Sequence, residues 1–307
     1  MENTMSIIET RRTKSLVEQI AKIIFTTFAV VAVVAVFSIT AYMIYLGTPA
    51  LSSVGVLELL FGTEWKPTAA EPFFGIFYVI LTSIFGTAMA LLIGVPIGLL
   101  TAVFLAEVSN KKLAAIVQPA VELLAAIPSV IYGLIGVMIL KPFMFQIEKW
   151  IFTDSKTHQF TGGANLLSAI LVLAIMILPT VINISTSSIK AVQASLRSAS
   201  LALGATKIQT IFKVVLPAAK SGIMTAIVLG MGRALGEAMA INMVAGGSVN
   251  LPLPFNSVKF LTTAIVSEMS YSAGIHRQVL FTIGLVLFAF IMFVNIILTR
   301  IIKKEED

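Results

Sequence analysis

Two charged residues lie inside a long apolar stretch of the sequence. Arg233 and Glu237 interrupt an otherwise uncharged run from Ser221 to Gly247. Arg233 follows Lys220 by thirteen residues, and thirteen residues advance about 20 Å along a continuous helix. The hydrocarbon core of a membrane is about 30 Å thick, and an arginine at its centre costs at least about 2.5–3.5 kcal/mol. Charged residues at such a depth are typical of a substrate or ion pathway.

The guanidinium of Arg233 is suited to binding an anion. Glu237 lies four residues later, so the two side chains share one face of a helix and can pair. The base precedes the acid, which is the less favourable order for such a pair. We therefore infer that Arg233 faces a polar pathway for an anion and that Glu237 orients it. The alternative is an internally compensated ion pair or a packing device, with Gly230, Gly232 and Gly236 allowing a neighbouring helix to approach.

The composition indicates a polytopic membrane protein. The 307 residues are 58% hydrophobic and 12% charged, with a mean hydropathy of +0.99, whereas soluble domains carry about 25% charged residues. The absence of cysteine excludes disulfides and cysteine-ligated metals. His158 and His276 are too far apart in sequence to suggest a metal site. No group of histidines and carboxylates has catalytic spacing, so we expect neither an enzyme nor a metal site.

The placement of basic residues predicts the orientation in the membrane. Fourteen of the 21 lysines and arginines fall near the two termini and on one set of loops, six fall on the alternate loops, and Arg233 is the remaining one. The positive-inside rule places the larger set in the cytoplasm. Both termini are then cytoplasmic, which requires an even number of spans, and the apolar runs indicate six. The uncharged run from Ile23 to Leu57 is longer than the apolar core of a signal peptide.

The sequence therefore predicts an all-α protein with six transmembrane helices. Proline and glycine suggest where spans are interrupted, with a kink or break at Gly94–Gly98 and a break at Ala126–Ser129. A broken helix can aim backbone N–H groups at an anion, which makes Ser129 a candidate pathway residue, although a plain proline kink is the alternative. We expect loop 141–163 to be a solvated outer surface and Trp65 to be an interface anchor. The expected segments are an N-terminal cytoplasmic arm 1–19 and spans 20–46, within 73–106, within 113–140, 165–185, one containing Arg233, and 279–302.

The cytoplasmic segment 187–220 is too long for a simple turn. Helix-forming residues flank Gly204, which indicates two short helices joined by a glycine turn. Its second half carries apolar residues at helical spacing. These are Ile208, Ile211, Phe212 and Val215. The pattern alone predicts an amphipathic helix that lies on the membrane surface or docks to a partner.

This segment resembles the EAA loop of ABC-importer permeases. Gly204 is followed after nine residues by Val214, and then after one by Leu216-Pro217. In that family the loop is the coupling helix that sits in a groove of the ATPase subunit. The chain has Ser198-Ala199-Ser200 where the family often has Glu-Ala-Ala, which affects any contact of that glutamate but not the identity of the loop. The resemblance implies coupling residues Ser198, Ala199, Gly204, Ala205, Ile208, Ile211, Phe212, Leu216 and Pro217.

Three further stretches resemble the phosphate permeases of the PstC family. They are Leu60–Pro67, Leu123–Gly133 and Gly232–Ala240, and the resemblance covers nearly the whole chain. The homologous PstA family usually has Glu-Thr-Ala-Pro after the glycine of the third stretch, which this chain lacks. The resemblance implies the type I ABC importer permease (MetI-like) fold, with residues 73–302 as the permease domain and 187–220 as its coupling segment.

The resemblance also implies a function and partners. The substrate would be inorganic phosphate, carried across a bacterial inner membrane with a second, PstA-like permease, a dimer of PstB-like ATPase subunits and an extracytoplasmic PstS-like phosphate-binding protein. The chain has no Gly-x4-Gly-Lys-Ser/Thr loop, so MgATP would be bound by the partner ATPase and no cofactor by this chain. The alternatives are a permease for sulfate or molybdate, or a stand-alone secondary anion transporter or channel. A stand-alone carrier has no need of segment 187–220.

Overall fold

The computed structural model describes residues 2–304, with the side chains of residues 18–297, 299 and 300. The described chain is almost entirely helical, and one short hairpin, β1 (Trp65–Lys66) with β2 (Phe73–Phe74), is antiparallel. The predicted all-α class is confirmed. The helices are α1 (Glu2–Val54), α2 (Val56–Phe61), α3 (Phe77–Val103), α4 (Lys111–Ala126), α5 (Ser129–Ile135), α6 (Lys141–Ile151), α7 (Leu166–Ala191), α8 (Ala194–Ala202), α9 (Lys207–Thr210), α10 (Leu216–Ala218), α11 (Lys220–Gly236), α12 (Met239–Val244), α13 (Leu261–Glu268) and α14 (Gly274–Lys304), with π-helices η1 (Phe104–Val108), η2 (Gly136–Leu140) and η3 (Ile211–Val215).

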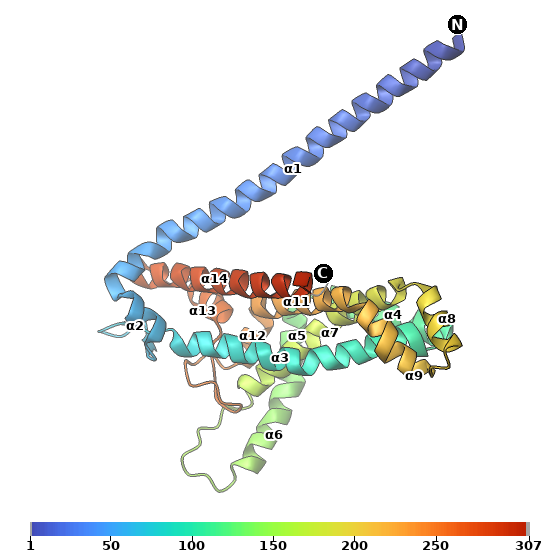
Figure 1. Cartoon of the computed structure of the whole chain (residues 1–307). Helices are drawn as coiled ribbons and strands as arrows, with labels where there is room; N and C mark the ends of the chain where they lie inside the picture. Colours follow the sequence, from blue (N-terminus) through green and yellow to red (C-terminus); the bar gives the residue numbers. More distant parts are fainter. Residues whose placement is uncertain (1, 305–307) are drawn as a thin grey trace.

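Helix α7 is the centre of the body. It packs against α3, α11, α4 and α12, and most of its side chains are buried. Helix α1 packs against α14 through its C-terminal part, where Tyr42 contacts Phe281, whereas its N-terminal part extends away from the body and is largely exposed (Figure 1). The expected arm, residues 1–19, continues the same helix from Glu2. Met1 and the side chains of residues 2–17 lie outside the described residues, so the cytoplasmic location of this arm stays a prediction.

The number of apolar helices agrees with the predicted topology. By length and composition, five described helices can cross a membrane, and a sixth crossing results if the bent pair Lys207–Ala218 and Lys220–Gly236 is one span. This pair bends by 70° at its junction. The five are Glu18–Val54, Phe77–Val108, Ser129–Ile151, Leu166–Ala191 and Gly274–Ile297.

Of the kink or break expected at Gly94–Gly98, the break does not occur. Helix α3 continues through Pro96 to Val103. A Cβ atom on Gly94 would lie 2.6 Å from Ile177, and one on Gly98 would lie 2.8 Å from Val181. The two glycines therefore let α3 approach α7 closely, which is the usual role of small residues between membrane helices.

The outer loop expected over 141–163 begins with a helix and is partly buried. Helix α6 runs to Ile151, and Glu148 within it is 0% exposed. Its carboxylate accepts hydrogen bonds from His158 Nε2 at 2.9 Å and from the backbone N–H of Thr161 at 2.9 Å. The prediction of a solvated surface is confirmed for Asp154 and Lys156, which are exposed, but not for Glu148, because the chain folds back over α6 and supplies the partners that a buried carboxylate needs.

A second buried carboxylate fastens the hairpin to the last two helices. Glu268 is 3% exposed and accepts hydrogen bonds from Trp65 Nε1 at 3.1 Å, from His276 Nε2 at 2.8 Å and from Lys259. Trp65 also packs against Phe74 and His276. Trp65 is therefore a partly buried member of this cluster, and its indole N–H faces Glu268; its role as an interface anchor stays a prediction.

Candidate functional site

The helix that carries Arg233 ends in the middle of the predicted span. Helix α11 stops at Gly236, and Glu237 has extended backbone with φ −73° and ψ 129°. The chain becomes helical again at Met239, where α12 begins. We expected one helix through this stretch, so Arg233 and Glu237 were wrongly placed on a single helix face. Within the described residues no ion pair joins them.

Glu237 makes hydrogen bonds that satisfy backbone polar groups at this break. Its Oε1 accepts the backbone N–H of Ala240 at 3.0 Å, and its own carbonyl accepts the hydroxyl of Thr262 at 2.7 Å. An interrupted helix leaves N–H and C=O groups without partners, and in a membrane no water is available to replace them. The carboxylate therefore stabilises the start of α12 directly, which the sequence pattern did not indicate.

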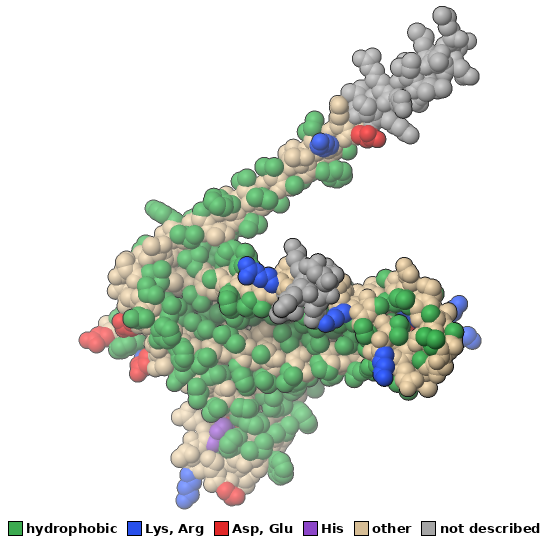
Figure 2. Space-filling view, in the orientation of Figure 1, with side chains coloured by type: hydrophobic (Ala, Val, Ile, Leu, Met, Phe, Trp, Pro, Cys, Tyr) green, Lys and Arg blue, Asp and Glu red, His purple; other side chains and the backbone are tan. Residues whose placement is uncertain are grey.

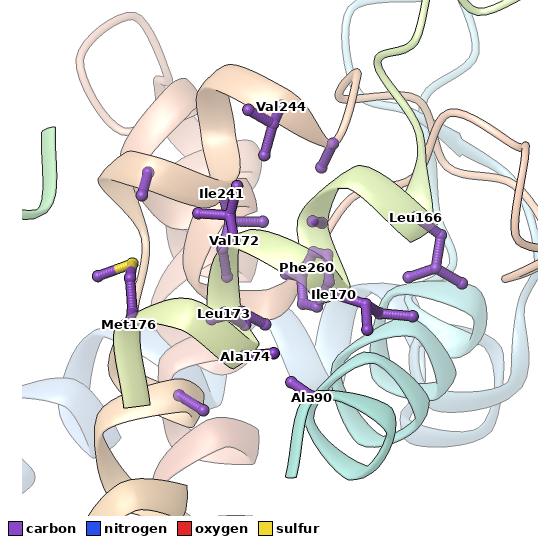
Figure 3. Packing of buried hydrophobic residues seen from close by; sticks show 14 of the residues in the cluster. Ala90, Leu166, Ile170, Val172, Leu173, Ala174, Met176, Ile241, Val244 and Phe260 are labelled. Atoms are coloured by element: carbon purple, nitrogen blue, oxygen red, sulfur yellow. The ribbon is translucent and has the colours of Figure 1, made fainter. Parts of the chain in front are cut away.

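The two interrupted helices lie against each other. Helix α4 ends at Ala126 and α5 begins after Pro128, as predicted. Helices α5 and α12 pack together, and a Cβ atom on Gly133 would lie 3.0 Å from the Cα of Ala240. On its other side α12 is anchored in the core, where Ile241 lies beside Val172 of α7 (Figure 3). The breaks at Pro128 and Glu237 thus meet in one region of the fold.

Arg233 lies at the edge of this region. It is in the last turn of α11, where a cation interacts favourably with the helix dipole. Its side chain is partly exposed and makes no hydrogen bond or ion pair with any other described residue. It lies within electrostatic range of Tyr132, whose hydroxyl donates to the carbonyl of Leu124 at 2.7 Å. The guanidinium is therefore available to a ligand.

The site is open on one side. Gly232 and Gly236 are exposed, and a Cβ atom on either would meet nothing within 4 Å. Of the three glycines expected to contact a neighbouring helix, only Gly230 does so in this chain, at 3.2 Å from Val181 for a Cβ atom. Gly236 is one turn beyond Arg233, so the guanidinium lies next to a helix face that this chain leaves uncovered.

Ser129 belongs to the same region through α5. It is the first residue of that helix and is partly buried. Tyr132 follows three residues later, so the two side chains share a face of α5. Sequence reasoning missed Tyr132, although its spacing from the Pro128 break could have indicated it. No cluster of three or more metal-ligating side chains occurs within the part of the chain that the structure describes.

The coupling segment has the predicted two short helices. Helix α8 is followed by Gly204 with φ +85°, a conformation that glycine adopts without strain. Helix α9 then begins with a capping box between Thr206 and Gln209. The hydroxyl oxygens of Ser200 and Thr210 are 2.9 Å apart and join the two helices.

The apolar side chains of this segment form two separate stripes. Ile208 and Phe212 are 70% and 54% exposed, whereas Ile211 is 4% exposed and packs in a core cluster with Val215. The expectation that Ile211 shares the outward face with Ile208 and Phe212 is wrong. Ile208 and Phe212, four residues apart, form one row that faces outward, whereas Ile211 and Val215 form a neighbouring row that faces the core. Figure 2 shows hydrophobic side chains on the surface of this end, where α8 and α9 lie. Of the other coupling residues, Ser198, Ala199, Gly204 and Pro217 are exposed, and Ala205 and Leu216 are partly buried.

Comparison with known proteins agrees with this architecture. Residues 94–306 match the family "Binding-protein-dependent transport system inner membrane component". The chain is 38% identical to the "Probable ABC transporter permease protein YqgH" of Bacillus subtilis, over 96% of this chain and 95% of that one. It is 33% identical to the "Phosphate transport system permease protein PstC" of Pasteurella multocida, over 91% and 90% of the two chains.

Solved structures of similar fold are chains of ABC transporters. A chain of a bacterial alginate ABC transporter aligns over 89% of this chain and 95% of its own length, with a TM-score of 0.58 and 18% identity. A chain of the MetNI methionine ABC transporter in an inward-facing conformation aligns over 75% and 94%, with a TM-score of 0.53 and 22% identity. These likenesses confirm the predicted MetI-like fold.

The contact between the two interrupted helices can be tested with a matched pair of substitutions. Gly133→Ala puts a methyl group 3.0 Å from the Cα of Ala240, so we expect the free energy of unfolding to fall by about 1–3 kcal/mol. Gly232→Ala meets nothing within 4 Å, and we expect it to raise that free energy by about 0.5–1 kcal/mol. Unfolding of the purified chain in detergent, followed by circular dichroism, measures both. Equal effects would contradict the packing of α5 against α12.

Proposed function

The chain belongs to the family of binding-protein-dependent transport system inner membrane components, and we propose that it is the subunit through which an ABC importer passes inorganic phosphate. Its membership of this family and its apolar helices identify it as a multi-pass inner-membrane permease subunit of an ABC importer. The finer assignment to phosphate is supported by relatives named as phosphate permeases, at 32–34% identity. The name of YqgH, a more similar relative, states no substrate.

The observation that carries the proposal is the free guanidinium of Arg233 beside two interrupted helices. A guanidinium offers two parallel N–H groups to two oxygens of an oxyanion. Phosphate near neutral pH also keeps at least one P–OH proton, whereas sulfate keeps none. One carboxylate oxygen of Glu237 accepts the Ala240 N–H, and the other can accept the P–OH proton while repelling the unprotonated oxygen of sulfate. In this proposal Ser129 lines the same pathway.

The partners follow from the surfaces that the chain leaves uncovered. We assign the open face beside Gly232 and Gly236 to a second, PstA-like permease, which completes the pathway around Arg233. The exposed apolar row at Ile208 and Phe212 contacts one subunit of a PstB-like ATPase dimer, which binds MgATP. A PstS-like phosphate-binding protein delivers the anion from the outer side. The alternative of a stand-alone secondary transporter predicts uptake that does not require ATP.

Substitutions at Arg233 and Glu237 test the anion site. In vesicles that contain the assembled importer, Arg233→Lys keeps the charge but loses the paired N–H groups, and we expect phosphate uptake to fall by about tenfold or more. Glu237→Gln keeps an oxygen for the Ala240 N–H, so we expect the fold to survive while sulfate uptake rises relative to phosphate uptake. The uptake of radiolabelled phosphate and of radiolabelled sulfate is measured in vesicles that lack the binding protein, so that only the permease selects the anion.

The control for Arg233→Lys is Arg277→Lys, at an exposed position near the start of α14, where uptake should not change. Normal phosphate uptake by Arg233→Lys would remove Arg233 from the anion site. An unchanged ratio of sulfate to phosphate in Glu237→Gln would leave Glu237 with its helix-capping role alone.

The coupling surface is tested by Phe212→Asp. Phe212 is 54% exposed, so the fold should tolerate the change, but an unpaired charge in an apolar contact with the ATPase is costly. We expect the ATPase to be lost when the permease is purified. Phe160→Asp makes the same change at a side chain of 49% exposure on loop 152–165, far from α9 in sequence, and should retain the ATPase. Retention by Phe212→Asp would contradict the contact.

The proposed orientation, with both termini in the cytoplasm, is tested in the cysteine-free chain. Lys156→Cys and Lys207→Cys replace exposed residues on opposite sides of the proposed membrane. An impermeant thiol reagent added to cells with a permeabilised outer envelope should label position 156 and not position 207. The reverse pattern would invert the topology.

A further inference from the structure

One arginine joins the coupling segment to the membrane helices. Arg197, in α8, donates from Nε at 3.0 Å and from Nη2 at 2.6 Å to Oε1 of Glu107, in η1. The same guanidinium donates from Nη2 to the carbonyl of Ile189 at 2.8 Å and from Nη1 to the carbonyl of Val192. All three of its nitrogens are thus occupied, and the side chains of Arg197 and Glu107 are 23% and 11% exposed.

The two carbonyls belong to the end of the central helix. Ile189 is in the last turn of α7 and Val192 is its C-cap, and carbonyls at a helix C-terminus lack partners within their own helix. A cation placed there is stabilised by the helix dipole. One side chain therefore connects the consecutive helices α7 and α8 to η1, whose Glu107 lies 90 residues before Arg197 in the sequence.

An apolar cluster also joins the coupling segment to the membrane helices. Ile211 and Val215 of η3 pack with Ala102 and Val103 of α3 and with Ile189 of α7. Apolar contacts are not directional, so they hold the segment close without fixing its angle. Hydrogen bonds from a planar guanidinium do fix an angle. Glu107 also lies in a π-helix, a distortion that is frequent at functional sites.

We propose that the Arg197–Glu107 pair is the positioning contact that converts movement of the coupling segment into movement of α3 and α7. The pair sets the direction of α8 relative to the ends of both helices, so a displacement of α8 by an ATPase is passed to the membrane. This inference rests on the proposed function, because it requires an ATPase that moves the segment. It gives Arg197 and Glu107 no contact with the anion.

The test measures coupling rather than activity alone. Glu107→Ala and Arg197→Ala are placed in the assembled importer in vesicles, and phosphate transported per ATP hydrolysed is measured. Coupling between two sites is commonly worth about fivefold or more, so we expect this ratio to fall by at least about fivefold in each variant. The double variant should lose no more than Arg197→Ala alone, because that substitution already removes every contact between the two residues. Glu107→Gln, which keeps an oxygen for Arg197, should show a smaller fall, and it replaces Glu107→Ala if that variant does not assemble.

The matched control is Glu64→Ala, which removes a different ion pair. Glu64 Oε2 lies 2.8 Å from Lys66 Nζ, and the two side chains are 56% and 61% exposed. Exposed pairs contribute little, so the ratio should stay at its wild-type value. A wild-type ratio in Glu107→Ala and Arg197→Ala, or losses that add in the double variant, would overturn the proposal.

A second measurement does not depend on which anion is carried. Spin labels on Ser195→Cys in α8 and Leu100→Cys in α3, both exposed, report the distance between the coupling segment and the membrane helix in the otherwise cysteine-free chain. We expect Arg197→Ala to broaden the distribution of distances and Glu64→Ala to leave it unchanged. If the wild-type importer carries no phosphate but the distribution broadens, the substrate assignment fails and the positioning contact stands. If phosphate is carried and the distribution stays narrow, the positioning contact fails.

Discussion

The site depends on one constraint, which is that the backbone polar groups at two interrupted helices must find hydrogen-bond partners. Inside a membrane a helix can stop only where other groups replace its lost hydrogen bonds. Here Tyr132 donates to the carbonyl of Leu124 near the first break, and Glu237 accepts the N–H of Ala240 after the second. Thr262 donates to the carbonyl of Glu237. These contacts let polar side chains and a guanidinium gather in the same region.

Close packing around α7 holds the two breaks together. Glycines of α3 remove the side chains that would otherwise separate it from Ile177 and Val181 of α7. Helix α12, although only six residues long, buries Ile241 and Val244 in the same core. Since packing between membrane helices relies on such close approach rather than on the hydrophobic effect, a short helix can be held firmly enough to position Glu237.

Features that depend on local pattern were predictable from the sequence, and those that depend on distant partners were not. Six apolar runs, the break at Pro128 and the turn at Gly204 follow from hydropathy and from proline and glycine chemistry. The end of α11 at Gly236 does not, because Thr262, which binds the carbonyl of Glu237, is 25 residues away. The contact between Trp65 and Glu268 was not predictable either, because the two residues lie 203 positions apart in the sequence. The contact between Glu148 and His158 was missed because a chain reversal, which no periodic pattern marks, brings the two side chains together.

The uncovered face beside Arg233 has a consequence for biogenesis. A chain inserted without its neighbours presents this guanidinium next to lipid, at a cost of at least about 2.5–3.5 kcal/mol near the bilayer centre. Association with another subunit removes that cost, so the orphan chain is less stable than the assembled one. Cellular proteases act on such destabilised proteins. In the proposed function, the residue that binds the anion is therefore also the residue whose exposure distinguishes an unassembled copy from an assembled one.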